Sequence, residues 1–164
     1  MPSNRRQKAR NGYGNDYSVL DGLDLQLLAK LRDTPRISMS DLAKAVRLSR
    51  PAVVERVRNL ERDGVISGWR VEIDPAKLGL PLSAYIRVRP LQGRLSTVAN
   101  LAKATPQVVE CHRITGEDCF LMKVDFASVK ALEQIIDRFL LYGQTTTSIV
   151  QSSPVPLRSP PLPE

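Results

Sequence analysis

Residues 49–62 combine apolar side chains at helical spacing with groups that hydrogen-bond to nucleic acid. Val53, Val57 and Leu60 recur at steps of three and four, so one helix face turns inward and the opposite face stays polar. Hydroxyl, guanidinium and carboxylate groups can hydrogen-bond to base edges, and arginines that do not reach a base can neutralise phosphates. We predict base contacts by Ser49, Arg50, Ala52 and Glu55, and phosphate contacts by Arg56 and Arg58. The alternative is a solvated helix face, on which these arginines pair with Glu55 and Glu61.

Three short helical segments would position these side chains. Leucines recur with helical period over residues 20–31, which predicts a first amphipathic helix. Ser38 resembles the start of a capping box and opens a second helix, which ends near residue 47. Ser49 can cap the third helix, and Gly64 stops it. A short helix, a tight turn and a basic helix over residues 37–56 suit the DNA major groove, which admits one helix.

The segment after the third helix has the pattern of a small β-hairpin. Val65 and Ile66 precede a turn, and residues 69–73 then resume a strand-like pattern. We expect this hairpin to form a wing beside the helices, with Arg70 as a further phosphate contact. Residues 20–74 would then be one winged helix-turn-helix domain. Residues 75–82, which include two prolines and a glycine, predict a linker.

A second unit follows over residues 83–151, in which the spacing of apolar residues alternates between strand and helix. Its predicted elements are a strand at 84–89, a helix around 98–102, strands at 108–114 and 119–126, a helix around 132–139, and a strand at 145–150. This order predicts an α+β, ferredoxin-like βαββαβ sheet with both helices on one face. If the other face is apolar, a second copy of the unit is its simplest cover.

Composition and charge narrow the function classes. The 164 residues carry a net charge of +7, which favours an anionic partner such as nucleic acid. Residues 1–80 hold 15 basic and 10 acidic side chains, and residues 81–164 hold 9 and 7, so the field is strongest in the first half. Residues 1–19 predict a flexible basic arm, and residues 152–164 a Pro-rich tail without a fold. No apolar run approaches the roughly 20 residues that span a bilayer, so no membrane role is expected.

The sequence offers little for catalysis or for metal binding. His112 is the sole histidine, and Cys111 and Cys119 are the only cysteines, which gives no recognisable ligand spacing. Neither a phosphate-binding glycine loop nor a nucleophile elbow occurs. We therefore expect no metal, no cofactor and no enzymatic activity. Two cysteines and no secretory signal favour the cytoplasm.

Several motifs of this chain resemble the Lrp/AsnC transcriptional regulators, over about residues 20–151. The first half carries Leu20-Asp21, Ile37-Ser38, Leu48-Ser49-Arg50-Pro51 and Arg56-Val57-Arg58-Asn59-Leu60-Glu61-Arg62-Asp63-Gly64-Val65-Ile66. The second half carries Val108-Val109-Glu110-Cys111-His112-Arg113-Ile114-Thr115-Gly116 and Thr147-Ser148-Ile149-Val150. The two sets occur in the order and at the spacing of the family.

The resemblance implies a regulator that binds double-stranded DNA and responds to an amino acid or a related metabolite. It implies a homodimer, with dimers assembling into larger rings such as octamers. Carried over to this chain, the effector pocket would include the loop residues Gly116, Glu117 and Asp118 and the strand residues Thr146 and Ser148. An acidic side chain suits the ammonium of an amino acid, and N–H and hydroxyl groups suit its carboxylate. These residues are equally compatible with plain hairpin and strand chemistry. Cys119 and Phe120 stand where better-known members have an acidic and an aromatic residue.

Two other functions fit the same frame. Some decarboxylases of haem biosynthesis, of the sirohaem type, resemble this family and would bind a tetrapyrrole; the single histidine and the intact basic third helix argue against that reading. An architectural protein that coats DNA without sequence preference is the second alternative, because charge alone supports nonspecific binding.

Overall fold

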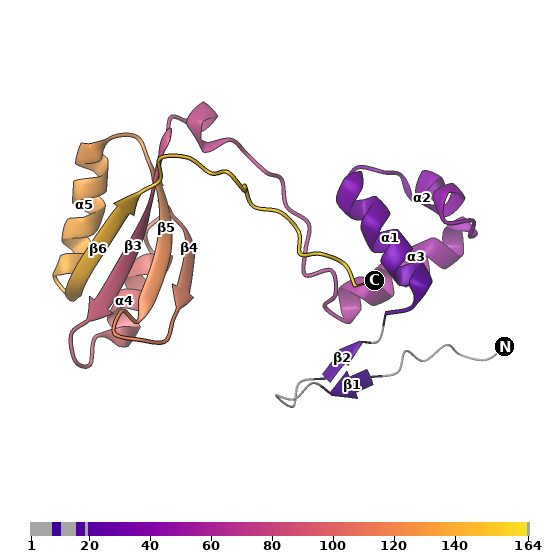
Figure 1. Ribbon diagram of the computed structural model, residues 1–164, viewed down its shortest axis with the longest axis horizontal. Helices are drawn as coiled ribbons and strands as arrows, with labels where there is room; N and C mark the ends of the chain where they lie inside the picture. Colours follow the sequence, from indigo (N-terminus) through magenta and orange to yellow (C-terminus); the bar gives the residue numbers. More distant parts are fainter. Residues whose placement is uncertain (1–7, 11–15, 19, 164) are drawn as a thin grey trace. The chain divides into compact units, whose positions relative to one another are not determined.

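The computed structural model describes residues 8–10, 16–18 and 20–163. The chain divides into two compact units, Met1–Val71 together with Leu157–Glu164, and Glu72–Pro156 (Figure 1). Each unit has a hydrophobic core of its own.

The described residues of the first unit include three helices: α1 (Gly22–Asp33), α2 (Met39–Ala45) and α3 (Arg50–Arg62). Ser38 caps α2 by accepting a hydrogen bond from the backbone N–H of Asp41, at 3.1 Å. The third helix ends at Arg62, and Gly64 follows with a φ of 72°, which glycine adopts without strain. The predicted helix-turn-helix is therefore present. Its core consists of Leu27, Leu31, Leu42, Ala43, Val46, Val53 and Val57.

The predicted hairpin after α3 is wrong for the described chain, where residues 65–74 contain no strand. The backbone N–H groups of Val65 and Ile66 both donate to the carbonyl of Leu60, at 2.9 and 3.0 Å, and so close the end of α3. These two residues are therefore not available as a strand, and residues 69–73 lack a partner strand among the described residues. Trp69, Val71 and Ile73 remain exposed.

Near the amino terminus, β1 (Lys8–Arg10) pairs antiparallel with β2 (Asp16–Ser18). The sequence predicted an arm without regular structure over residues 1–19. A strand of three residues spans a single alternation of side chains, so periodicity does not reveal it. The rest of that arm, residues 1–7, 11–15 and 19, lies outside the described residues.

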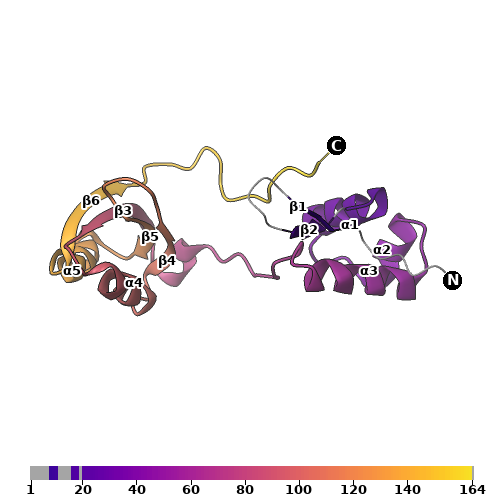
Figure 2. The same ribbon diagram turned by 90° about the horizontal axis from the view of Figure 1, so that it is seen from below.

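The second unit is the predicted ferredoxin-like domain. It contains β3 (Leu82–Pro90), α4 (Leu95–Lys103), β4 (Val108–Arg113), β5 (Phe120–Phe126), α5 (Val129–Leu140) and β6 (Gly143–Ile149). The strands lie in the order β4-β5-β3-β6, and every neighbouring pair is antiparallel. Both helices cover the same face of this sheet (Figure 2). The buried core lies between them and the sheet, and includes Ile86, Met122 and Phe139.

The other face of the sheet is mainly polar, which the sequence left open. Tyr85, Arg87 and Arg89 project from β3 on this side, opposite to the buried Ala84, Ile86 and Val88. The segment before β3 is also more ordered than the predicted linker. A 3₁₀ helix, η1 (Pro75–Leu78), is capped by Asp74 and followed by Gly79 with a φ of 79°. At the other end of the chain, residues 150–163 form neither helix nor strand.

Candidate functional sites

The amino-terminal end of α3 is open to solvent and carries most of the predicted base contacts. Arg50 and Glu55 are exposed, and Ala52 is half-buried. The hydroxyl of Ser49 accepts a hydrogen bond from the backbone N–H of Ala52 at 3.4 Å, so this side chain caps the helix and stays exposed. The four residues share one end of one helix, which is where a recognition helix meets base edges.

Two further arginines lie near this surface. Arg58 is exposed on α3. Arg47 is exposed in the turn between α2 and α3 and has a φ of 55°, in the left-handed region. Arg47 was not among the residues predicted to contact DNA; its basic side chain in the turn, two residues before the cap at Ser49, was the available signal. Arg47, Arg50 and Arg58 all place exposed guanidinium groups on the helix-turn-helix.

Arg56 corrects the sequence prediction, because its side chain turns toward α1. Its Nη1 atom lies 2.7 Å from Oδ2 of Asp21 and 3.0 Å from Oδ1 of Asp24. Asp24 is 0% exposed, and the Arg56 side chain is 21% exposed. The guanidinium thus neutralises a buried carboxylate at the start of α1 rather than reaching for phosphate. On a helix, residues two apart point about 200° apart, so Arg56 and Arg58 serve different surfaces.

The same carboxylates form the cap of α1. The backbone N–H of Asp24 donates to Oδ1 of Asp21 at 2.8 Å, and the backbone N–H of Asp21 donates to Oδ2 of Asp24 at 3.3 Å. Burial alone would raise the pKa of Asp21, but hydrogen bonds from Arg56 and from the backbone N–H of Asp24 outweigh it and hold the pKa below its usual range. Burial lowers the pKa of Arg56, and the bonds to both carboxylates more than reverse that effect. Arg56 therefore stays charged and ties α3 to α1.

The residues that were expected to form a wing have another attachment. The indole Nε1 of Trp69 donates to Oε1 of Glu61 at 2.7 Å, which fixes the chain beside the end of α3. Arg70 follows and is exposed. It stays a candidate phosphate contact, although no hairpin carries it.

The second candidate site is the loop between β4 and β5. Gly116 has a φ of 108°, a conformation that side-chain-bearing residues rarely adopt. Glu117 forms an ion pair with Arg89. Asp118 lies 3.7 Å from Nη1 of Arg87 and 3.8 Å from Nε of Arg89. Two acidic and two basic groups thus meet at the bare face of the sheet.

The strand residues of the predicted effector site adjoin this cluster. Thr146 pairs with Arg87 across the β3–β6 ladder, and Ser148 pairs with Tyr85. Both are exposed on the same face. Asp118 and Thr146 therefore both lie beside Arg87 of β3, and Ser148 lies beside Tyr85 of the same strand. Arg87 and Arg89 were missed as site residues, although their alternation with buried residues placed them on this face.

Other kinds of site are not indicated in the described part of the chain. No group of three or more His, Cys, Asp or Glu side chains that could hold a metal occurs among the described residues. Cys111 and Cys119 are free thiols, and burial raises the pKa of Cys111. Within the same residues, no helix has the length and apolar character needed to cross a bilayer.

Comparison with known proteins assigns both units. Residues 20–67 match a winged helix-turn-helix DNA-binding domain, and residues 83–160 match the Lrp/AsnC ligand binding domain. The HTH-type transcriptional regulator LrpC of Bacillus subtilis is 34% identical over 81% of this chain and 92% of its own length. The uncharacterized HTH-type transcriptional regulator YezC of the same organism is 40% identical over 82% and 95%.

Solved structures agree with these sequence matches. The structure of B. subtilis LrpC superposes with a TM-score of 0.77 and covers 82% of this chain and 96% of LrpC. A feast or famine regulatory protein from Mycobacterium tuberculosis, complexed with L-methionine, reaches 0.79 at 30% identity, over 86% of this chain and 98% of that one.

A helix-turn-helix unit joined to a ligand-binding βαββαβ domain defines a class of DNA-binding transcriptional regulators. Within that class, this chain belongs to the Lrp/AsnC family.

Proposed function

We propose that this regulator binds duplex DNA through the exposed face of α3, and that an amino acid held at the β4–β5 loop changes that binding. The observation that carries the proposal is the cluster of Arg87, Arg89, Glu117 and Asp118, in which opposite charges are paired at an otherwise bare sheet face. The L-methionine complex of the related M. tuberculosis protein supports an amino acid as the ligand class.

The DNA interface is assigned by exposure. Ser49, Arg50, Ala52 and Glu55 would contact base edges from the amino-terminal part of α3, and Arg58 the phosphates. Arg47 and Arg70 are exposed basic residues in the same unit and would add phosphate contacts. Arg56 is not part of this surface, because it is committed to Asp21 and Asp24.

The effector site is assigned by charge. An amino acid carries a carboxylate and an ammonium, so it can replace the internal partners of both arginines and both acids at once. Its carboxylate would bind Arg87 and Arg89, and its ammonium Asp118 and Glu117. The hydroxyls of Thr146 and Ser148 lie on the same face and would add hydrogen bonds, and Gly116 lets the loop backbone approach. Ligand binding would thus exchange ion pairs within the loop for ion pairs to the ligand.

The sheet face that the helices leave uncovered also supports the assembly of several copies of this chain. The bare sheet face combines Tyr85, which is 41% exposed, with charged groups of both signs. A second copy can cover such a face by pairing unlike charges, which supports a homodimer and, through further copies, a larger homo-oligomer. A change in the loop at the edge of that face would then alter the spacing of two recognition helices on DNA.

The chain would act as a regulator and not as an enzyme, because the named relatives are transcriptional regulators. A protein whose partner is genomic DNA works in the compartment that holds the chromosome, which we take to be the cytoplasm.

DNA binding in the presence of each proteinogenic amino acid tests the proposal. Fluorescence anisotropy with DNA from the promoter of the regulator's own gene should change in midpoint with at least one amino acid. Arg87→Gln should abolish that change, with DNA binding in the absence of ligand nearly intact. Arg113→Gln, which removes an exposed arginine of β4 without a carboxylate partner among the described residues, is the matched control.

Gly116→Val provides a second test, because a φ of 108° strains any β-branched residue. It should remove the response without loss of DNA binding by the ligand-free protein. An equal response in wild type, Arg87→Gln and Gly116→Val would place the effector elsewhere. Loss of DNA binding in all variants alike would point to misfolding, and circular dichroism distinguishes that case.

A further inference from the structure

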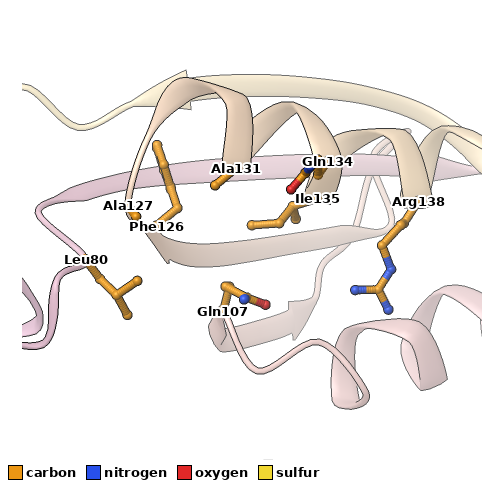
Figure 3. A pocket seen from close by; sticks show the side chains of 8 residues that line it. All are labelled: Leu80, Gln107, Phe126, Ala127, Ala131, Gln134, Ile135 and Arg138. Carbon is orange, nitrogen blue, oxygen red and sulfur yellow. The ribbon is translucent and has the colours of Figure 1, made fainter.

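A separate cavity opens on the helix side of the second unit, at the end of the sheet where β5 finishes (Figure 3). Its volume is about 310 Å³. One wall is the face of α5 that presents Ala131, Gln134, Ile135 and Arg138, and Gln107 lies opposite, in the turn before β4. The lining is completed by Leu80, Phe126 and Ala127.

The cavity has an apolar floor and a polar rim. Phe126 and Ile135 are buried beneath it, and Leu80 is half-buried at its side. At the rim, the guanidinium of Arg138 extends from α5 into the space below the helix, and the amide of Gln107 lies across from α5 (Figure 3). This division into one apolar and one hydrogen-bonding side is typical of small-molecule sites.

The charges at the rim have one sign. Arg138 is exposed and forms no ion pair with a side chain in the part of the chain that the structure describes. None of the lining residues carries a carboxylate, and the two glutamines are neutral. Arg138, Gln107 and Gln134 line the same cavity, and the Arg138 guanidinium offers N–H donors in a fork that matches a carboxylate.

The turn that carries Gln107 is held in place before any ligand arrives. Its backbone carbonyl accepts from the N–H of Asp125 at 3.0 Å. The buried Thr105 hydroxyl donates to the carbonyl of Leu101 at 2.7 Å, and the N–H of Val108 donates to the carbonyl of Thr105 at 2.9 Å. A fixed turn loses little conformational entropy when the site is filled.

We propose that this cavity is a second ligand site, which binds a small carboxylic acid with a short apolar tail. The carboxylate binds Arg138, with the amides of Gln107 and Gln134 as further donors, and the tail rests on Phe126, Ile135 and Ala131. A volume near 310 Å³ lies at the lower end for ligand pockets, which limits the tail to a few carbons.

This site is distinct from the effector loop. The loop adjoins Phe120, the first residue of β5, and its charged cluster lies on the bare sheet face. The cavity adjoins Phe126, the last residue of β5, on the face that the helices cover. The proposal therefore goes beyond the effector response and does not depend on it.

Isothermal titration calorimetry of the full chain with isovalerate tests the site, and isovaleramide serves as the uncharged probe. We expect saturable binding of isovalerate that weakens by about tenfold or more in Arg138→Gln, the cost of one charge-assisted contact. Ala131→Leu, which fills the cavity from a helix position that accepts leucine, should also abolish binding. Arg94→Gln, at an exposed arginine outside the cavity, should bind as wild type does.

Arg87→Gln separates this proposal from the effector response, because it should impair the loop and leave isovalerate binding unchanged. Absence of saturable isovalerate binding in the folded wild type would overturn the proposal. So would equal affinities for isovalerate and isovaleramide, or affinity unchanged in both Arg138→Gln and Ala131→Leu. Loss of binding in Arg87→Gln alone would assign the carboxylate to the loop and likewise overturn the second site.

Discussion

Replacing Arg56 with alanine should destabilise the helix-turn-helix, whereas the same change at Arg58 should not. Arg56 bonds to Asp21 at 2.7 Å and to the fully buried Asp24 at 3.0 Å. Removing one partner of a buried ion pair costs about 3–5 kcal/mol. The pair with Asp21 is partly exposed, and the Arg56 side chain is 21% exposed, so we expect a loss of about 2–3 kcal/mol.

The assay compares thermal unfolding with the salt dependence of DNA binding. Arg58 is exposed, so Arg58→Ala should change the free energy of unfolding by no more than about 0.5 kcal/mol. It should instead reduce the slope of log affinity against log salt by about 0.9 for the lost phosphate contact. Arg56→Ala should leave that slope unchanged at temperatures at which the unit stays folded.

Arg56→Lys is the control variant for this experiment. Arg56→Lys keeps the positive charge but loses the guanidinium fork, so its stability should lie between wild type and Arg56→Ala. A stable Arg56→Ala protein with a smaller salt slope would show that Arg56 binds phosphate. It would refute the reasoning that its bonds to α1 determine its role.

Three further predictions concern stability. The pKa of Asp21 in the folded protein lies below its ordinary value of 3.8, so in acid the unfolded state binds more protons than the folded state and the free energy of unfolding should fall. Thermal unfolding measured from neutral pH down to about 3 should show this loss, and Arg56→Ala should show a smaller one. Arg47→Gly should relieve the left-handed conformation at φ 55° and raise the unfolding free energy by up to about 1 kcal/mol, while DNA titration shows weaker binding because a charge is lost. Gly143→Ala should cost about 1–3 kcal/mol, because its Cβ would lie 2.4 Å from the carbonyl oxygen of Arg89; Gly22→Ala, with open space around it, is the control in the same unfolding assay.

Local sequence determined the helices and the order of the second unit. Ser38 and Ser49 were predicted as caps from their types, and both accept the expected backbone hydrogen bond. The alternation in β3 predicted its buried and exposed sides, because a strand's period of two differs from a helix's period of 3.6. Patterns of this kind depend on neighbours in the chain, so they can be read without coordinates.

The prediction of a hairpin after α3 was wrong because a hairpin depends on more than the local pattern. A strand requires a partner, and the groups that pair with a segment are not encoded in that segment. Residues 69–73 have an adequate strand pattern, but Val65 and Ile66 donate to Leu60 instead of pairing with them. The competition between a helix cap and a hairpin is decided by geometry that a pattern does not contain.

The corrected role of Arg56 and the omission of Arg87 also arise because the partner of each side chain lies far away in the sequence. In both cases the sequence held a partial signal. Asp24 lies among the leucines of α1 and is buried, and a buried carboxylate requires a cation; Arg56, 32 residues away, supplies it. Arg87 was correctly placed on the bare face by alternation, yet its closeness to Asp118 depends on the β4–β5 hairpin folding beside β3. A charge at a position that the pattern assigns to the core therefore predicts a partner. The pattern does not show which of several arginines is the partner. The sequence alone therefore does not distinguish an arginine that stabilises the fold from one that binds DNA.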